Sequence, residues 1–204
     1  MKTIFSRITA LFLLVFLLGC SSDTLVPCIP LTCKNGGVST SNCGCTCPQG
    51  YIGIDCSLQA TPSKITITKI TVRTFSNFDN GSNWDVLFPT SANATPDIYV
   101  KIKNSVGSDF YSSSTYFANA ISNGIRTFDF VPATPLEVTN AFSTYTFQLY
   151  DYDFADSNIN DGVDDLMATK VFSVYNQTGG FPSTLIISDT STLLSFELTL
   201  NYTW

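Results

Sequence analysis

Residues 195–204 read SFELTLNYTW, in which polar and apolar side chains alternate without a break. The apolar set is Phe196, Leu198, Leu200, Tyr202 and Trp204. Because successive side chains of a strand point to opposite faces, a period of two predicts a strand with one face buried and the other in solvent. This last segment therefore predicts a β-sheet that covers a hydrophobic core.

Alternating segments of the same kind recur from residue 64 onward, separated by Gly, Pro, Asn and Asp. No amphipathic stretch of helical length accompanies them. We therefore predict an all-β fold, in which residues 64–204 form an antiparallel β-sandwich. The expected strands cover residues 65–75, 98–102, 110–117, 125–131, 145–151, 170–175, 185–188 and 196–204.

A cysteine-rich segment precedes this domain. Six cysteines lie within residues 28–56, which is too short to bury a core without crosslinks. Residues 43–47 read CGCTC, and in an extended chain its three cysteines share one face, where they are poorly placed to bond each other. Each of them then pairs with one of the three cysteines outside the run, which leaves six arrangements.

Residues 33–56 read CKNGGVSTSNCGCTCPQGYIGIDC, and the segment 28–56 resembles an EGF-like module. The resemblance implies the disulfides Cys28–Cys43, Cys33–Cys45 and Cys47–Cys56, which is one of the six arrangements. A single residue between Cys43 and Cys45 is a shorter spacing than this family usually has. We expect the polar residues 57–63 to link this module to the sandwich.

The N-terminal residues have the pattern of a secretory signal. Lys2 and Arg7 lie in an acid-free start, and residues 8–18 are almost wholly apolar. Such a segment of about eleven residues is too short to span the ~30 Å hydrocarbon core of a bilayer. It predicts export of the chain.

Residues 17–20 read LLGC, which resembles the lipobox of bacterial lipoproteins. The resemblance implies a signal peptide over residues 1–19, a lipid on Cys20 and a tether over residues 20–27. Assigning Cys20 to the lipid leaves an even number of cysteines for disulfides. The expected location is the bacterial cell envelope, with the chain anchored to the outer membrane on its periplasmic or surface face.

Composition excludes several kinds of function. The formal net charge is −6 and the ten Lys and Arg residues do not cluster, so the sequence predicts no nucleic-acid partner. The chain contains no histidine, which excludes Ser-His-Asp catalysis and imidazole-bound metals.

Aspartates concentrate in residues 149–166, which read LYDYDFADSNINDGVDDL. Asp151 and Asp153 are two residues apart at the end of a predicted strand and therefore point to the same side. Carboxylates so close repel each other unless a cation lies between them, and clustered hard oxygen ligands favour Ca²⁺. The sequence predicts a calcium site here.

Three segments of the second domain resemble the C2 domain, a calcium-dependent lipid-binding β-sandwich: PDIYVKI at 96–102, TFQLYDYD at 146–153 and DDLMA at 164–168. The resemblance implies four calcium ligands, and we add Asp85 of the NWD segment as the ligand from the first loop. The loops are longer than is usual in this family, so Asp79, Asp161 or Asp164 remain alternatives. The expected ligand set is Asp85, Asp97, Asp151, Asp153 and Asp165.

These features predict a lipid-anchored binding or adhesion protein, not an enzyme, with a membrane contact through Cys20. A lipid, a glycan or a protein is the possible partner at the calcium loops, where Leu87, Phe88, Phe154 and Ile159 either insert into a membrane or pack within the loops. Two alternatives remain open. One is a structural envelope lipoprotein with no specific ligand, and the other is a glycan-active enzyme with paired aspartates.

Overall fold

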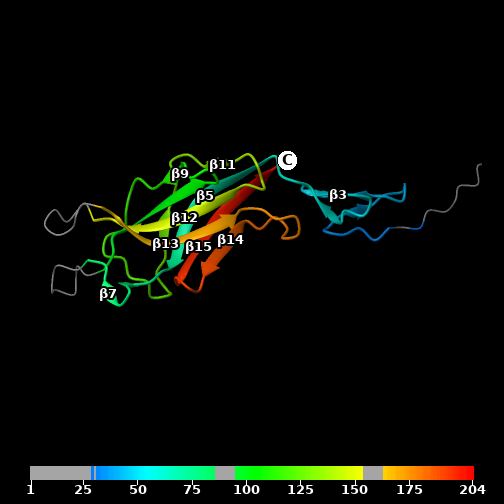
Figure 1. The fold of residues 1–204 in the computed structure, drawn as a ribbon. Coiled ribbons are helices and arrows are strands. Elements are labelled where there is room, and N and C mark those ends of the chain that lie inside the picture. Colours follow the sequence, from blue (N-terminus) through cyan, green and yellow to red (C-terminus); the bar gives the residue numbers. More distant parts are fainter. Residues whose placement is uncertain (1–28, 30, 86–94, 154–162) are drawn as a thin grey trace, which may run out of the picture.

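The computed structural model describes residues 29, 31–85, 95–153 and 163–204. All regular structure in these residues is β-strand, and none of them forms a helix that could cross a membrane. Figure 1 shows two parts, a small module that contains β3 (Tyr51–Ile52) and a larger sandwich. The all-β prediction is confirmed.

The first sheet of the sandwich has five antiparallel strands. Its order is β10-β5-β15-β14, and β11 also pairs with β5. The central pair, β5 and β15, is long and is interrupted by two register shifts. The strands are β5 (Lys64–Thr74), β10 (Phe128–Phe130), β11 (Leu136–Val138), β14 (Thr184–Asp189) and β15 (Leu194–Thr203).

The second sheet has four antiparallel strands in the order β13-β12-β8-β9. The strands are β8 (Ile98–Asn104), β9 (Asp109–Ser112), β12 (Thr144–Asp151) and β13 (Asp165–Ser173). A separate hairpin of β6 (Phe78–Asp79) and β7 (Ser82–Asn83) follows β5. Asn80 and Gly81 form its turn, and both have positive φ, at 47° and 92°.

The core lies between the two sheets. Phe147 of β12 and Phe196 of β15 stack with ring centroids 4.0 Å apart, and Phe172 of β13 meets Phe196 edge-on at 5.4 Å. In β15 the alternation predicted from the sequence is present, because Leu194, Phe196, Leu198 and Leu200 are all buried. Burial of this kind is the main term that stabilises a sandwich.

Several strand predictions differ from the structure in length. The predicted strand 110–117 ends at Ser112 in β9, and the predicted strand 125–131 is reduced to the three residues of β10. By contrast, β13 begins at Asp165, five residues before the predicted start, because Asp165 pairs with Asp151 across the sheet. The strand β11 was not predicted, since three residues are too few to show a period.

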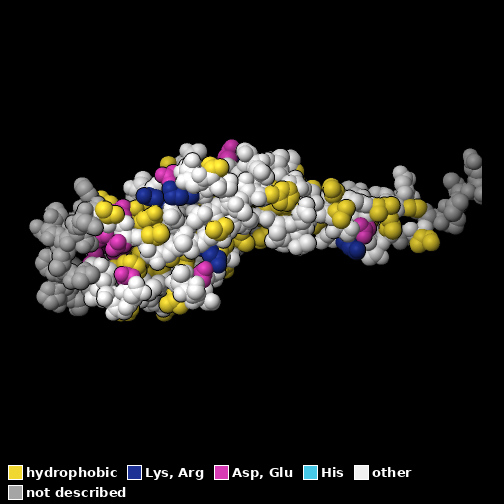
Figure 2. Space-filling model, viewed as in Figure 1, with side chains coloured by type: hydrophobic (Ala, Val, Ile, Leu, Met, Phe, Trp, Pro, Cys, Tyr) yellow, Lys and Arg dark blue, Asp and Glu magenta, His cyan; other side chains and the backbone are white. Residues whose placement is uncertain are grey.

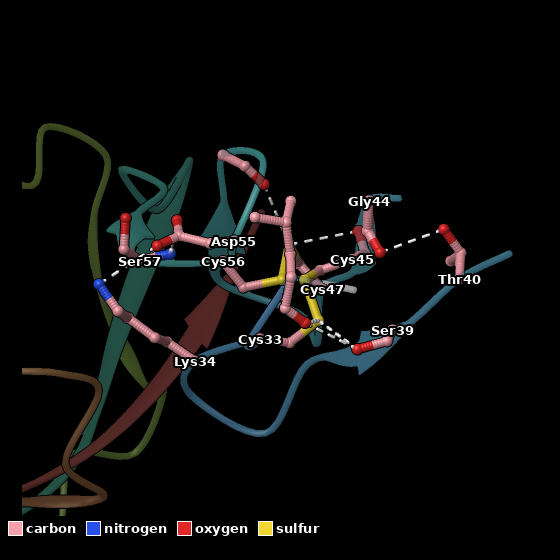
Figure 3. Close-up of a disulfide and its surroundings, with 12 residues drawn as sticks. Cys33, Lys34, Ser39, Thr40, Gly44, Cys45, Cys47, Asp55, Cys56 and Ser57 are labelled. Atoms are coloured by element: carbon pink, nitrogen blue, oxygen red, sulfur yellow. Dashed lines mark hydrogen bonds and ion pairs between the residues drawn. A yellow bond between two sulfur atoms is a disulfide. The ribbon is translucent and has the colours of Figure 1, made fainter. Parts of the chain in front are cut away.

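The small module contains two two-stranded sheets. In one of them β1 pairs with β2, and in the other β3 pairs with β4. Disulfides join Cys33 to Cys45 and Cys47 to Cys56, two of the pairings that the EGF-like resemblance implies (Figure 3). Cys43 is also disulfide-bonded, but its expected partner Cys28 lies outside the described residues, so that pairing stays a prediction. The strands are β1 (Val38–Ser39), β2 (Cys45–Thr46), β3 (Tyr51–Ile52) and β4 (Leu58–Gln59).

The segment expected to be a linker is partly ordered against both parts. Within residues 57–63, β4 pairs with β3, and the Ala60 amide donates to the Gly50 carbonyl at 2.8 Å. The Ala60 carbonyl in turn accepts a hydrogen bond from the Trp204 indole at 3.3 Å. These contacts join the small module directly to the end of β15.

Aromatic side chains complete this junction. Tyr51 of β3 meets Phe181 edge-on with ring centroids 5.4 Å apart, and Phe181 meets Trp204 at 4.9 Å. Gly50 lies so close that a Cβ there would be 2.6 Å from atoms of both Phe181 and Trp204. The close approach requires glycine at this position, and the junction is a packed contact between the two parts.

Candidate metal site

The inward-facing side of β12 is apolar along most of the strand, and at the C-terminal end of the strand two aspartates continue the same row. Tyr145, Phe147 and Leu149 point inward, and by the same alternation Asp151 and Asp153 follow them. Both aspartates are buried, with 0% and 4% of their surface exposed. Aspartate is almost never buried to this degree unless it is paired, hydrogen-bonded or bound to a cation.

A third acid reaches the same place from a different part of the chain. Asp85 follows Trp84, which is buried and whose indole nitrogen donates to the Ser76 carbonyl at 3.0 Å. One carboxylate oxygen from each of Asp85, Asp151 and Asp153 lies within 4.8 Å of the others. We call these three residues the aspartate cluster.

The cluster lies at the end of the sandwich away from the small module. Figure 1 places the ends of β12 and β13 and the β6–β7 hairpin there, while β3 lies at the opposite end. Figure 2 shows several acidic side chains on the surface of that end. The two ends of the sandwich thus differ in chemistry, because the end that contacts the small module is aromatic and the opposite end is acidic.

The two oxygens of Asp151 have different surroundings. Oδ1 accepts a hydrogen bond from the Asp97 amide at 2.6 Å. Oδ2 is buried and has no hydrogen-bond partner among the described residues. A buried carboxylate oxygen without a donor is costly, and a bound cation would remove that cost.

The pKa of Asp151 is raised to about 7. Burial is the largest cause, the hydrogen bond from the Asp97 amide opposes it, and the negative charges of Asp85, Asp153 and Asp97 add to the rise. Without a cation, Asp151 therefore holds a proton far more tightly than an exposed aspartate does. A divalent cation would replace that proton.

Asp97 and Asp165 are neighbours of Asp151 but are not among the three residues whose carboxylate oxygens converge within 4.8 Å. Asp97 Oδ1 accepts from the Asn119 amide at 2.7 Å, and its carbonyl accepts from the Tyr152 amide at 2.8 Å, so Asp97 ties three segments together. Asp165 lies in β13 and is exposed. For these two residues the assignment as ligands stays a prediction.

The three alternative calcium ligands named from the sequence, Asp79, Asp161 and Asp164, are not part of the aspartate cluster as the structure describes it. Asp164 accepts hydrogen bonds from the Tyr99 hydroxyl at 2.6 Å and from the Asp153 amide at 3.3 Å. Asp79 is exposed in β6 and accepts from the Asn80 side chain. Asp161 lies outside the described residues, as do Leu87, Phe88, Phe154 and Ile159.

The donor set fits a hard cation. Three carboxylates supply up to six oxygens, and Ca²⁺ takes six to eight oxygen ligands in flexible geometry. Mg²⁺ demands a tight octahedron and keeps several waters, so a group of three carboxylates suits it less well. What the aspartate cluster can do chemically is bind a cation and thereby fix the three segments that carry it.

A pH dependence follows from the pKa of Asp151. Unfolded aspartate has a pKa near 3.9, so between about pH 4 and pH 7 the folded chain binds more protons than the unfolded chain, and stability falls as pH rises. In EGTA we expect the wild type to lose on the order of 2–3 kcal/mol relative to Asp151→Asn between about pH 5 and pH 8. Urea unfolding of both proteins at the two pH values measures this difference, and parallel pH profiles would contradict it.

Comparisons with known proteins place the chain in no family. No family model matches it, and no curated protein matches its sequence. Among solved structures, the human GIVD cytosolic phospholipase A2, in complex with methyl gamma-linolenyl fluorophosphonate inhibitor and terbium chloride, is 14% identical with a TM-score of 0.42. That match covers 71% of this chain and 18% of the phospholipase chain. A structure described as a C2 domain is 8% identical with a TM-score of 0.40, over 69% of this chain and 98% of that one.

Proposed function

We propose that this chain is a lipid-anchored binding protein of the bacterial cell envelope whose β-sandwich binds Ca²⁺ at the aspartate cluster. In this proposal the cation orders the loops at one end of the sandwich for a partner. The small module holds that end away from the membrane. The role is binding and not catalysis, in keeping with a chain that has no histidine.

One observation carries the calcium proposal. Three carboxylates from two distant segments converge within 4.8 Å, and Asp151 Oδ2 is buried there without a hydrogen-bond donor among the described residues. A solvated acidic turn would instead leave its carboxylates exposed and apart. The C2 resemblance of residues 96–102 and 146–153 supports the same reading.

Calorimetric titration of the full-length protein with CaCl₂ tests the site. We expect saturable binding near neutral pH with a Kd of about 10⁻⁴–10⁻³ M, the usual range for extracellular calcium modules. Asp151→Asn should weaken binding at least tenfold, because it removes a central ligand charge. Asp109→Asn should bind as the wild type does, since Asp109 lies on β9 in an ion pair with Lys103. Equal affinity in all three proteins would contradict the proposal.

The anchor proposal rests on the LLGC segment and on the cysteine count. A diacylated or triacylated cysteine holds a protein on a bilayer almost irreversibly, because each buried CH₂ contributes about 0.8 kcal/mol. Replacing Cys20 with Ser should therefore move the protein from the detergent phase to the soluble fraction of bacterial lysates. Phase partitioning followed by immunoblotting measures this, and a Ser variant that stays with the membranes would exclude the lipid.

A further inference from the structure

A polar hollow lies on the outer face of the four-stranded sheet, and the aspartate cluster is not part of it. Its volume is about 350 Å³. Tyr99, Lys101, Tyr116, Tyr152 and Asp164 line it, together with the hydroxyl side chains of residues 112–115. We call it the tyrosine pocket.

Strand register brings these side chains together. In β8 the even-numbered Ile98, Val100 and Ile102 face the core, so Tyr99 and Lys101 point to the outer face. Cross-strand pairing places Tyr150 of β12 beside Tyr99 and Ser112 of β9 beside Lys101. Regular strands thus hold Tyr99, Lys101 and Ser112, whereas the other lining residues lie just outside the strands.

Four tyrosines form a continuous wall of ring contacts. Tyr99 stacks on Tyr150 with centroids 5.3 Å apart and meets Tyr152 edge-on at 6.1 Å. Tyr152 in turn lies 4.8 Å from Tyr116. Tyr116 is 43% exposed, so the wall ends in an aromatic ring that solvent can reach. An exposed aromatic ring beside a hollow is a surface on which an apolar ligand face can lie.

The charges of the pocket balance. The Lys101 ammonium lies 5.2 Å and 4.9 Å from the ring centroids of Tyr99 and Tyr150, within cation–π range. Asp164 is held by the Tyr99 hydroxyl at 2.6 Å. Because the lining has one cation and one anion, an anionic ligand would meet Asp164 and a cationic ligand would meet Lys101. The electrostatics favour an uncharged ligand.

Hydroxyl groups supply the remaining polar surface. Ser113 is used internally, since its Oγ accepts from the Val100 amide at 3.1 Å. Ser112, Ser114 and Thr115 are exposed, and within the described part of the chain their hydroxyls make no hydrogen bond. Each can both donate and accept, which matches a ligand whose own groups do the same.

We propose that the tyrosine pocket binds an uncharged sugar unit of a glycan. A sugar ring has an apolar C–H face, which suits the exposed ring of Tyr116, and an edge of hydroxyls, which suits residues 112–115, Lys101 and Asp164. A fatty acyl chain would leave those polar groups without partners, and a phosphate would lie against the Asp164 carboxylate. The proposal does not depend on calcium binding.

A glycan array tests the proposal. The full-length protein is applied in detergent to printed neutral oligosaccharides and to sulfated, phosphorylated and sialylated ones, in Ca²⁺ and in EGTA. We expect binding to neutral oligosaccharides. Calorimetry with the strongest neutral binder then compares the wild type with Tyr116→Ala, for which we expect about a tenfold loss of affinity. Tyr116→Phe, which keeps the ring, should retain most of the affinity.

Phe78→Ala is the matched control, because Phe78 is a surface aromatic that is 54% exposed and does not line the pocket. It should bind as the wild type does. Absence of neutral binding, binding confined to acidic glycans, or an equal loss in Tyr116→Ala and Phe78→Ala would each overturn the proposal. Binding that persists in EGTA while calorimetry shows no calcium site would support the tyrosine pocket and contradict the calcium proposal alone.

Discussion

Replacing Phe196 with Ala should lower the free energy of unfolding of the sandwich by about 3–5 kcal/mol, the usual cost of truncating a buried phenylalanine. Phe196 is fully buried and contacts two rings of the opposite sheet, Phe147 at 4.0 Å and Phe172 at 5.4 Å. The variant loses the burial of its own ring and leaves a cavity between the sheets. Because Phe196 is fully buried and contacts rings of the opposite sheet, few substitutions should cost more.

Urea unfolding followed by intrinsic fluorescence measures this loss. Ile186→Ala is the control, since Ile186 lies on the neighbouring strand β14 but is 55% exposed. Its unfolding free energy should stay within about 0.5 kcal/mol of the wild type. Similar losses in the two variants would mean that the core does not lie between the sheets as described.

Calcium should raise the melting temperature of the wild type on the order of 10 °C at a concentration of about 100 Kd. Binding to the folded state alone adds about 2.7 kcal/mol at that concentration, and each kcal/mol shifts the melting temperature of a domain of this size by a few degrees. Mg²⁺ should produce a smaller shift. Without calcium, the double variant Asp151→Asn/Asp153→Asn should be at least as stable as the wild type, because it lacks two repelling buried charges.

Melting curves in Ca²⁺, Mg²⁺ and EGTA measure these shifts. The matched control is Asp109→Asn/Asp129→Asn, which removes the same charge from two surface ion pairs, with Lys103 and Lys69. It should keep the full calcium shift, whereas the variant of Asp151 and Asp153 should lose it. A wild-type curve that does not respond to calcium would refute the metal site and leave the fold unaffected.

Periodicity predicts the long strands of this protein well, because β5, β12 and β15 each bury one face against the other sheet. The short strands are not visible in that pattern. Two or three residues, as in β3 or β11, show no period, and such strands form because a neighbouring strand is already in place. Their location is a tertiary effect.

All three residues of the aspartate cluster belong to the ligand set expected from the sequence, but the hydrogen bonds around them do not follow from it. Asp151 and Asp153 follow the inward row of β12, which the alternation of residues 145–151 already indicates. The roles of Asp97 and Asp164 were not predictable, since their hydrogen bonds join residues that are far apart in the sequence: the Asp97 amide to Asp151, and the Tyr99 hydroxyl to Asp164. The tyrosine pocket could not be predicted from the sequence for the same reason, because Tyr99 and Tyr150 meet only through the pairing of β8 with β12.

The position of the small module has a mechanical consequence. It joins the sandwich where β5 begins, and the strands run from there toward the aspartate cluster at the opposite end (Figure 1). If the chain is held at the small module and a partner pulls at the aspartate cluster, the tension runs parallel to the strands. Asp151 ends β12 in the other sheet and Asp153 follows it, so the tension reaches them across the packed core. The hydrogen bonds within each sheet, such as those between β5 and β15, lie across that direction and resist sliding of one strand past its neighbour. This geometry resists tension better than one in which the bonds open one at a time.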